Sequence, residues 1–376
     1  MTRILTYHDI DQQQWRLLIN QSPTATWFQT PEAYAFYASL PEEMTPFAVG
    51  VVEECKVSQW ANSDLKVLND LKDGSTDRLA GVIVGYITRE KNPMKQFFTR
   101  RAIIVGGPLL ADDISDEALS ALLKAAAQFK VESLKCKGKA TSEAVTSALT
   151  PYTLHPTPIY IESRNFHDYS KWKSVFETNG FAYQPHYDIH VHCNAQHQMS
   201  EQRIRQVKKA LKNGVEIVEA SSEQEIRDWY EILYKLYCEK VRMPLFSEEF
   251  FLQFYRNGVG KYLLVKYQGK VIGGMMCPIL KGKAIYEWYV CGLDEEYREQ
   301  YPSVMATYAA IEYAKQNGLP LFDFMGAGKP DIPYGVRDFK MEFGGALVEY
   351  GRFLCVRKPL LYWIGEMGVK ILKNKY

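Results

Sequence analysis

The sequence predicts an α/β protein of two similar domains, each with a mixed, mostly antiparallel sheet flanked by helices. The chain has 376 residues, and 47% of them are hydrophobic, which is enough for two separate cores. The order of expected elements, β-α-α-β-β-β-α-β-α-β, occurs once in each half of the chain. We expect a boundary near residues 194–202, giving domains 1–194 and 195–376, the second with a short tail. The two halves are expected to superpose.

In the first half, short apolar runs predict strands and helical apolar stripes predict helices. The clearest stripe carries Leu119, Leu122 and Leu123 on one face of a helix expected over 116–134. The expected strands are 4–7, 46–53, 79–88, 101–110, 159–162 and 181–192, and the expected helices are 10–20, 31–40, 116–134 and 169–179.

In the second half, helix ends are marked by specific residues. Ser222 and Glu225 form a capping box that starts a helix. Pro244 ends this helix, Ser247 caps the next one, and Gly318 ends a third. The expected strands are 215–219, 262–266, 270–280, 283–292, 321–325 and 347–356; further helices are expected over 247–257, 303–317 and 337–343.

Composition excludes several classes of protein. The formal net charge is +1, so no global basic field indicates nucleic-acid binding. The seven cysteines have no C-x-x-C spacing, which argues against a disulfide framework or a zinc cage. The N-terminus lacks an apolar signal region, and no apolar run approaches the roughly 20 residues of a spanning helix. The sequence therefore predicts a reduced, cytoplasmic protein with polar surface loops at 54–78 and 135–157.

One segment near the end of the chain predicts a ligand site. An apolar strand over 321–325 runs into glycines, which let the backbone turn without a side chain in the way. A basic, aromatic segment follows, containing Phe339-Lys340-x-x-Phe343-Gly344. We expect a cleft at the carboxyl end of a sheet, with Lys340, exposed on a short helix, as the cation for an anionic substrate.

These features resemble the GNAT N-acyltransferase fold repeated in tandem. In detail they resemble the Fem family, bacterial aminoacyltransferases that use aminoacyl-tRNA to add residues to peptidoglycan precursor peptides. The resemblance rests on Trp-Phe-Gln-Thr-Pro at 27–31, the basic helix 203–213, the run 309–326 and the segment 334–345. Family members with characterised cell-wall roles carry a substrate-contacting lysine after the first of these segments. Residues 34–40 contain none here, and the long coiled-coil arm of some members is absent.

The resemblance implies roles for several residues. Lys340 would stabilise the tetrahedral oxyanion of acyl transfer, and Arg337 and Phe339 of the same segment would bind substrate. Arg203 and Arg205 would contact the diphosphate of a nucleotide- or lipid-linked precursor; a solvated helix face is the alternative. The implied donor substrate is aminoacyl-tRNA, with no further cofactor.

Four more residues are expected near the substrate. Strand alternation places Tyr286 and Trp288 on one face and Glu287 and Tyr289 on the other, so one pair packs in the core and the other lines a groove. Asp323 would either orient the acceptor amine or bond backbone amides, and we favour the second role.

The loops before two helices argue against coenzyme A. Acyl-CoA transferases of this fold hold the pyrophosphate on a glycine-rich loop that opens a helix. Residues 111–116 contain three acids instead, and residues 297–303 contain no glycine. The predicted function is therefore transfer of an amino acid from aminoacyl-tRNA to an amine of a peptidoglycan precursor. The alternatives are an N-acyltransferase that uses acetyl-CoA in envelope polysaccharide synthesis and a non-catalytic precursor-binding protein.

Two further patterns each allow two interpretations. His186, Asp188, His190 and His192 share one face of a strand, as either metal ligands or a solvent-facing polar face. We favour the second and expect no metal. The tail 360–375 mixes aromatic, aliphatic and lysine residues, so it would either lie on the anionic inner face of the membrane or pack against its domain.

Overall fold

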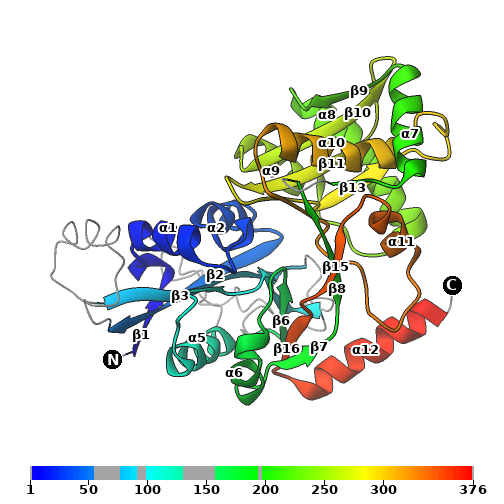
Figure 1. Ribbon diagram of the computed structural model, residues 1–376. Coiled ribbons are helices and arrows are strands. Elements are labelled where there is room, and N and C mark those ends of the chain that lie inside the picture. The colour runs from blue at the N-terminus through cyan, green and yellow to red at the C-terminus, as the bar shows by residue number, and fades with distance from the viewer. Residues whose placement is uncertain (1, 55–76, 91–98, 130–156, 194–196, 375–376) are drawn as a thin grey trace, which may run out of the picture. The chain divides into compact units, whose positions relative to one another are not determined.

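The structure, a computed structural model, describes residues 2–54, 77–90, 99–129, 157–193 and 197–374 (Figure 1). The chain forms two compact units. Unit 1 comprises Met1–Gln184 with Arg352–Tyr376, and unit 2 comprises Pro185–Gly351. The predicted surface loops at 54–78 and 135–157 fall almost wholly outside the described residues. The end of the predicted helix 116–134 and the start of the predicted domain boundary at 194–202 also lie outside them.

Unit 1 contains a mixed sheet with helices on both faces (Figure 1). The order of its described strands is β1-β2-β3-β4-β6-β16-β7, with β5 paired to β3. Only the pair β4 and β6 is parallel among these strands. The strands are β1 (Thr2–Thr6), β2 (Met44–Glu54), β3 (Asp77–Thr88), β4 (Arg101–Gly106), β5 (Leu109–Leu110), β6 (Tyr160–Asn165), β7 (Ala182–Gln184) and β16 (Arg352–Val356). The α-helices are α1 (Gln12–Gln21), α2 (Pro31–Ala38), α5 (Asp116–Gln128), α6 (Lys173–Thr178) and α12 (Pro359–Asn374).

Unit 2 repeats this arrangement. Its described strands have the order β15-β8-β14-β12-β11-β10-β9, with β13 paired to β11, and only β12 and β14 are parallel among them. The strands are β8 (Tyr187–His192), β9 (Val215–Glu219), β10 (Gly260–Tyr267), β11 (Lys270–Leu280), β12 (Ala284–Tyr286), β13 (Tyr289–Gly292), β14 (Leu321–Asp323) and β15 (Ala346–Glu349). The α-helices are α7 (Glu201–Lys212), α8 (Glu223–Leu236), α9 (Glu248–Arg256), α10 (Pro302–Gln316) and α11 (Gly335–Met341). The predicted fold class, two mixed sheets each flanked by helices, is confirmed.

The two units exchange strands, which the sequence analysis did not predict. The expected strand 181–192 is broken at Pro185, so that β7 joins the sheet of unit 1 and β8 joins that of unit 2. The expected strand 347–356 is broken at Gly351, which has a φ of 65°, and β15 and β16 likewise join different sheets. The compact units therefore differ from the predicted domains 1–194 and 195–376 by β8 and by the C-terminal segment from β16 onward.

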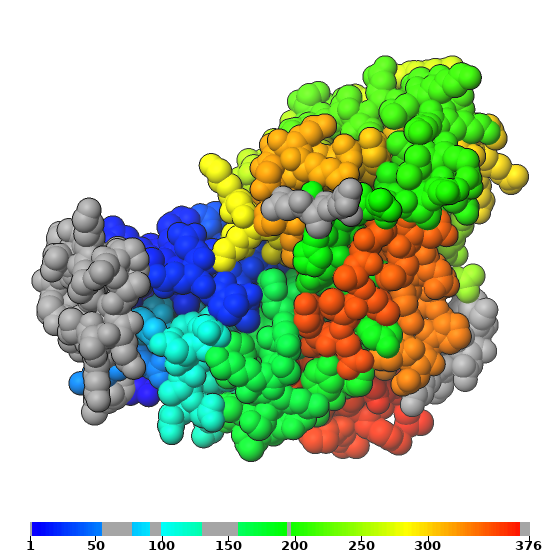
Figure 2. All heavy atoms as spheres, viewed as in Figure 1, coloured from blue at the N-terminus to red at the C-terminus, as the bar shows by residue number. Residues whose placement is uncertain are grey.

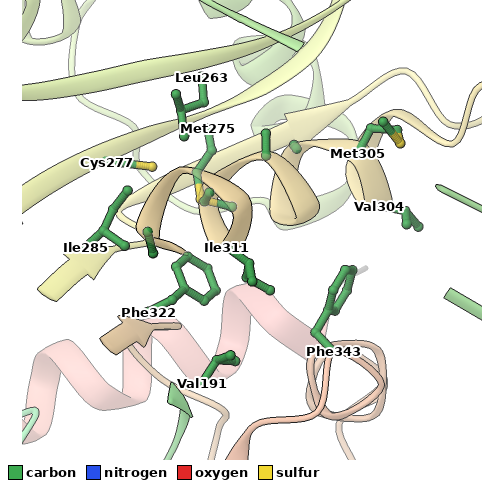
Figure 3. Close-up of a cluster of buried hydrophobic side chains, with 14 of the residues drawn as sticks. Val191, Leu263, Met275, Cys277, Ile285, Val304, Met305, Ile311, Phe322 and Phe343 are labelled. Atoms are coloured by element: carbon green, nitrogen blue, oxygen red, sulfur yellow. The ribbon is translucent and has the colours of Figure 1, made fainter. Parts of the chain in front are cut away.

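The core of unit 2 lies between α10 and one face of the sheet (Figure 3). Met305 and Ile311 of α10 belong to the same buried cluster as Met275 and Cys277 of β11 and Phe322 of β14. On the other face, α8 and α9 contribute a second group of buried rings. Among them, Trp229 of α8 packs edge-on against Phe251 of α9 and Tyr262 of β10. Covering both faces fixes β12 and β14 rigidly, and the candidate site lies where these two strands end.

Candidate active site

The carboxyl ends of β12 and β14 form the centre of the candidate site. The strands run parallel, with Tyr286 paired to Asp323, and their last link is the hydrogen bond from Glu287 N to Asp323 O, 2.9 Å long. Beyond it the strands part. Trp288 N donates to Met276 O, so the chain continues as β13 beside β11 and away from β14. In open α/β sheets, ligands bind where neighbouring strands diverge in this way.

Lys340 is buried at this point and is not the exposed lysine that the sequence analysis predicted. Its side chain is only 10% exposed, and Nζ lies 2.9 Å from Glu287 Oε1. Nζ also donates to the carbonyl oxygens of Phe324 and Gly326, each at 2.9 Å. An ammonium group has three donors, so every N–H of Lys340 has a protein acceptor. Lys340 is buried because the face of the short helix α11 that carries it packs against the turn after β14.

Asp323 shapes the turn that follows β14. Its Oδ1 accepts a hydrogen bond from Met325 N at 2.6 Å, and Met325 adopts a φ of 55°, unusual for a residue other than glycine. This contact with a backbone amide is the structural role that the sequence analysis favoured for Asp323. It directs the carbonyl groups of the turn toward Lys340.

Two residues of β8 complete a buried polar cluster. His190 Nε2 lies 3.3 Å from Asp323 Oδ2, and both side chains are at most 5% exposed. Asp188 is buried too, and its Oδ1 accepts hydrogen bonds from Ile189 N and Gly326 N, both at 2.7 Å. The solvent-facing strand face predicted here is wrong for Asp188 and His190, because β8 lies inside the sheet between β14 and β15 and is buried on both faces.

Burial and neighbouring charges shift the pKa values of three residues in this cluster. Burial, and then the neighbouring Asp323 carboxylate, raise the pKa of Asp188 well above its usual range. Burial opposes the charged form of His190, but the carboxylates of Asp323 and Asp188 outweigh it and raise the pKa of His190. Burial likewise raises the pKa of Glu287, against the opposing effect of Lys340.

The same cluster has the composition of a metal site. One ligand atom from each of Asp188, His190 and Asp323 lies within 4.8 Å of the others, and imidazole with carboxylates suits a divalent ion. Oδ2 of Asp188 has no hydrogen-bond partner among the described residues, and Oδ2 of Asp323 faces His190 Nε2. The sequence analysis expected no metal here, and that expectation stays a prediction.

The other face of α11 holds the start of α7. Phe339 and Phe343 lie under the Arg203 guanidinium, whose carbon is 4.4 and 5.5 Å from the two ring centroids. Arg203 Nε is 3.0 Å from Glu342 Oε2, and Ser200 N donates to Glu342 O at 2.8 Å. Two segments that the Fem resemblance singled out therefore contact each other. Arg203 is 8% exposed and is engaged in this contact, while its neighbour Arg205 is largely exposed and pairs with a glutamate of its own helix.

Arg337 braces the loop after β14. Its guanidinium donates to the carbonyl oxygens of Ala327, Lys329 and Ile332 and lies over the Tyr187 ring. These contacts give Arg337 a structural task in addition to the predicted substrate binding, which stays a prediction.

The three predicted aromatic residues do not alternate as expected, because the strand is interrupted between β12 and β13. Tyr286 is fully buried. Trp288 and Tyr289 are both half-buried and their rings contact those of Phe250 and Phe251 from α9. Trp288 and Tyr289 therefore belong to one aromatic cluster rather than to opposite faces.

Comparison with known proteins agrees with this architecture. Residues 198–341, all within unit 2, match a family model described as an acetyltransferase (GNAT) domain. FemX is 14% identical with a TM-score of 0.62, over 96% of this chain and 99% of FemX. L-PGS from Bacillus licheniformis is 10% identical with a TM-score of 0.51, over 97% of each chain. A tandem GNAT protein from the clavulanic acid biosynthesis pathway, solved without AcCoA, is 10% identical with a TM-score of 0.50, over 94% of this chain and 98% of that one.

The chain has the tandem GNAT fold. Comparison with curated protein sequences gave no match. At these identities the structural similarity establishes the fold, while the chemistry must be argued from the residues of the site.

The helix that would hold a pyrophosphate in a GNAT unit is α10, and a carboxylate already occupies its start. Asp294 Oδ1 accepts a hydrogen bond from Ser303 N at 3.0 Å, and Oδ2 accepts one from the Ser303 hydroxyl. Glu295, Glu296 and Glu299 follow Asp294 in the same loop and form ion pairs with Lys240, Lys235 and Lys209, respectively. Exposed amides at a helix start attract anions, but here the protein supplies its own.

In unit 1 of the tandem GNAT fold, the charged side chains of Glu162, Arg164 and Arg352 pair with one another on β6 and β16, and the ends of β4 and β6 hold neutral side chains instead. At the ends of β4 and β6, Gln29 Nε2 donates to Gly107 O at 2.8 Å and the Tyr169 hydroxyl donates to Pro108 O at 2.6 Å. Both side chains are buried and neutral, and Gln29 comes from the 27–31 segment of the Fem resemblance. The Ser115 hydroxyl caps the start of α5, and two acids, Asp116 and Glu117, lie in the first turn of this helix. The candidate chemistry therefore belongs to unit 2.

Sequence reasoning missed three members of the cluster. Asp188 and His190 belonged to a recognised period-two pattern but were assigned to solvent, because the exchange of β8 into unit 2 leaves no local signal. Glu287 was noted only as facing away from Trp288. A single acid within an otherwise apolar strand was the signal that could have indicated a buried partner, here Lys340.

Proposed function

We propose that the protein transfers an aminoacyl group from aminoacyl-tRNA to an amine of a nucleotide- or lipid-linked peptidoglycan precursor. The observation that carries the choice of donor is the start of α10. Asp294 already engages the amide and the hydroxyl of Ser303, where a GNAT unit ordinarily binds the coenzyme A pyrophosphate. An aminoacyl ester is already activated and needs no such site. The resemblance of four segments to the Fem family supports the same donor.

In the proposed reaction the acceptor amine attacks the ester carbonyl at the ends of β12 and β14. The C–N bond forms, the bond from the carbonyl carbon to the ribose oxygen breaks, and the proton of the amine passes to the leaving oxygen. Lys340 provides a fixed positive charge beside the tetrahedral oxyanion. The three N–H groups of Lys340 are already bound to Glu287, Phe324 O and Gly326 O. Lys340 therefore acts through the electrostatic field of its charge and by positioning the turn after β14.

The match of residues 198–341 to an acetyltransferase domain favours a second candidate, an acyl-CoA-dependent N-acyltransferase. The two candidates make opposite predictions for acetyl-CoA. We expect titration calorimetry to show no binding of acetyl-CoA in the micromolar range, because the Asp294 carboxylate already occupies the start of α10. Asp294→Gly, which frees the amide of Ser303, is the control and should bind acetyl-CoA more tightly than the unaltered protein. A low-micromolar dissociation constant for the unaltered protein would favour the acyl-CoA candidate.

A further inference from the structure

Helix α12 carries an exposed apolar stripe. Leu360, Trp363, Ile364 and Met367 are 70%, 57%, 38% and 42% exposed. Their spacing of i, i+3, i+4 and i+7 places them on one face of the helix. The helix, red in Figures 1 and 2, lies at the surface. It forms although it contains Gly365 and Gly368, and glycine is a poor helix former.

The opposite face of α12 is already occupied by unit 1. The Tyr362 ring packs edge-on against Tyr160 of β6, with 5.3 Å between centroids. Just before the helix, Arg357 N and Lys358 N donate to Ile159 O at 2.8 and 3.0 Å. The two interpretations of the tail, membrane binding and packing against its domain, are therefore compatible. Packing uses one face of α12 and leaves the apolar stripe exposed.

The sequence around the stripe has an excess of basic residues. Residues 357–376 contain five basic residues and one acid, Glu366, a net charge of +4. The whole chain has a net charge of +1, so the remaining residues carry −3. An apolar stripe with a local excess of lysine is typical of helices that lie on anionic lipid, whereas a protein partner would require no such charge.

The helix is suited to lie on a bilayer and not to cross one. It has 16 residues, or about 24 Å at 1.5 Å per residue, shorter than the roughly 30 Å hydrocarbon core. Among the described residues, no helix has both the length and the hydropathy of a membrane span. Trp363 is of the residue type that is enriched at the level of the headgroups.

We propose that α12 binds the surface of an anionic bilayer, with Leu360, Trp363, Ile364 and Met367 inserted at the interface. This goes beyond the proposed chemistry and does not depend on the donor, so an inactive protein would still bind. The bilayer surface is also where a lipid-linked precursor would be found.

Flotation of the full-length protein with vesicles tests this inference. One set contains phosphatidylcholine alone, and the other also contains phosphatidylglycerol. We expect binding to the anionic vesicles only, and weaker binding at high salt. Leu360→Ser combined with Trp363→Ser should reduce binding at least about tenfold. The control is Met243→Ser, which removes a side chain that is 54% exposed on unit 2 and should leave binding unchanged.

Three results would overturn the inference. The first is no flotation of the unaltered protein with anionic vesicles. The second is equal flotation of the double variant, provided that circular dichroism shows both proteins folded. The third is a dimer in sedimentation velocity that the double variant abolishes without any change in flotation, which would make a second copy of the chain the occupant of the stripe.

Discussion

Lys340→Met is expected to lower the free energy of unfolding by about 3–5 kcal/mol, a large effect for one lysine. The substitution removes the partner of Glu287, whose side chain is only 6% exposed, and leaves the carbonyl groups of Phe324 and Gly326 without their donor. Urea unfolding followed by tryptophan fluorescence measures the change. An unchanged midpoint would mean that the ammonium group is solvated and the buried contacts described here do not form.

A second substitution separates stability from chemistry. Combining Lys340→Met with Glu287→Leu removes both buried charges, so most of the lost stability should return. If the Lys340 charge stabilises the oxyanion, turnover of this double variant stays roughly a hundredfold below that of the unaltered protein. Turnover that recovers together with stability would reduce Lys340 to a structural role.

Gly344→Ala is expected to destabilise unit 2 by about 2–5 kcal/mol. Gly344 has a φ of 80°, which costs an alanine about 1–2 kcal/mol. An added Cβ would also lie 2.1 Å from the backbone oxygen of Gln198, and overpacking of this kind costs about 1–3 kcal/mol. The same unfolding experiment measures the effect.

Gly335→Ala is the matched control for this prediction. Gly335 begins α11, its φ is not positive, and no atom lies within 4 Å of an added Cβ. Alanine is a better helix former than glycine, so this variant should be as stable as the unaltered protein or more so. Equal destabilisation by the two substitutions would contradict the close approach of the chain at Gly344.

The sequence predicted the elements of the fold well because their signals are local. The boundaries of β9 and β11 agree with the predicted strands 215–219 and 270–280, and Ser222 caps α8 by accepting a hydrogen bond from Glu225 N. The exchange of β8 and β16 could not be predicted in this way. Strand pairing depends on partners far apart in the chain, and the breaks at Pro185 and Gly351 by themselves indicate only where a strand ends.

The candidate site was predicted in part. The segment 334–345 was singled out correctly as unusual, and the structure explains its pattern. Phe339 and Phe343 face Arg203, Lys340 faces the end of β14, and Gly344 permits a close backbone contact. Burial of Lys340 and Arg203 was not predicted, because charged residues on an isolated helix are ordinarily solvated. Their partners, Glu287 and Glu342, are brought to them only by the tertiary fold.

The central claim is that the donor is aminoacyl-tRNA, and a transfer assay tests it most directly. The unaltered protein is incubated with a nucleotide-linked precursor peptide carrying a free amine, together with either a pool of labelled aminoacyl-tRNA or labelled acetyl-CoA. Uncharged tRNA is the control for the first donor. We predict a precursor extended by an amino acid with aminoacyl-tRNA, and no labelled product with acetyl-CoA. An acetylated precursor, with no product from aminoacyl-tRNA, would contradict the account.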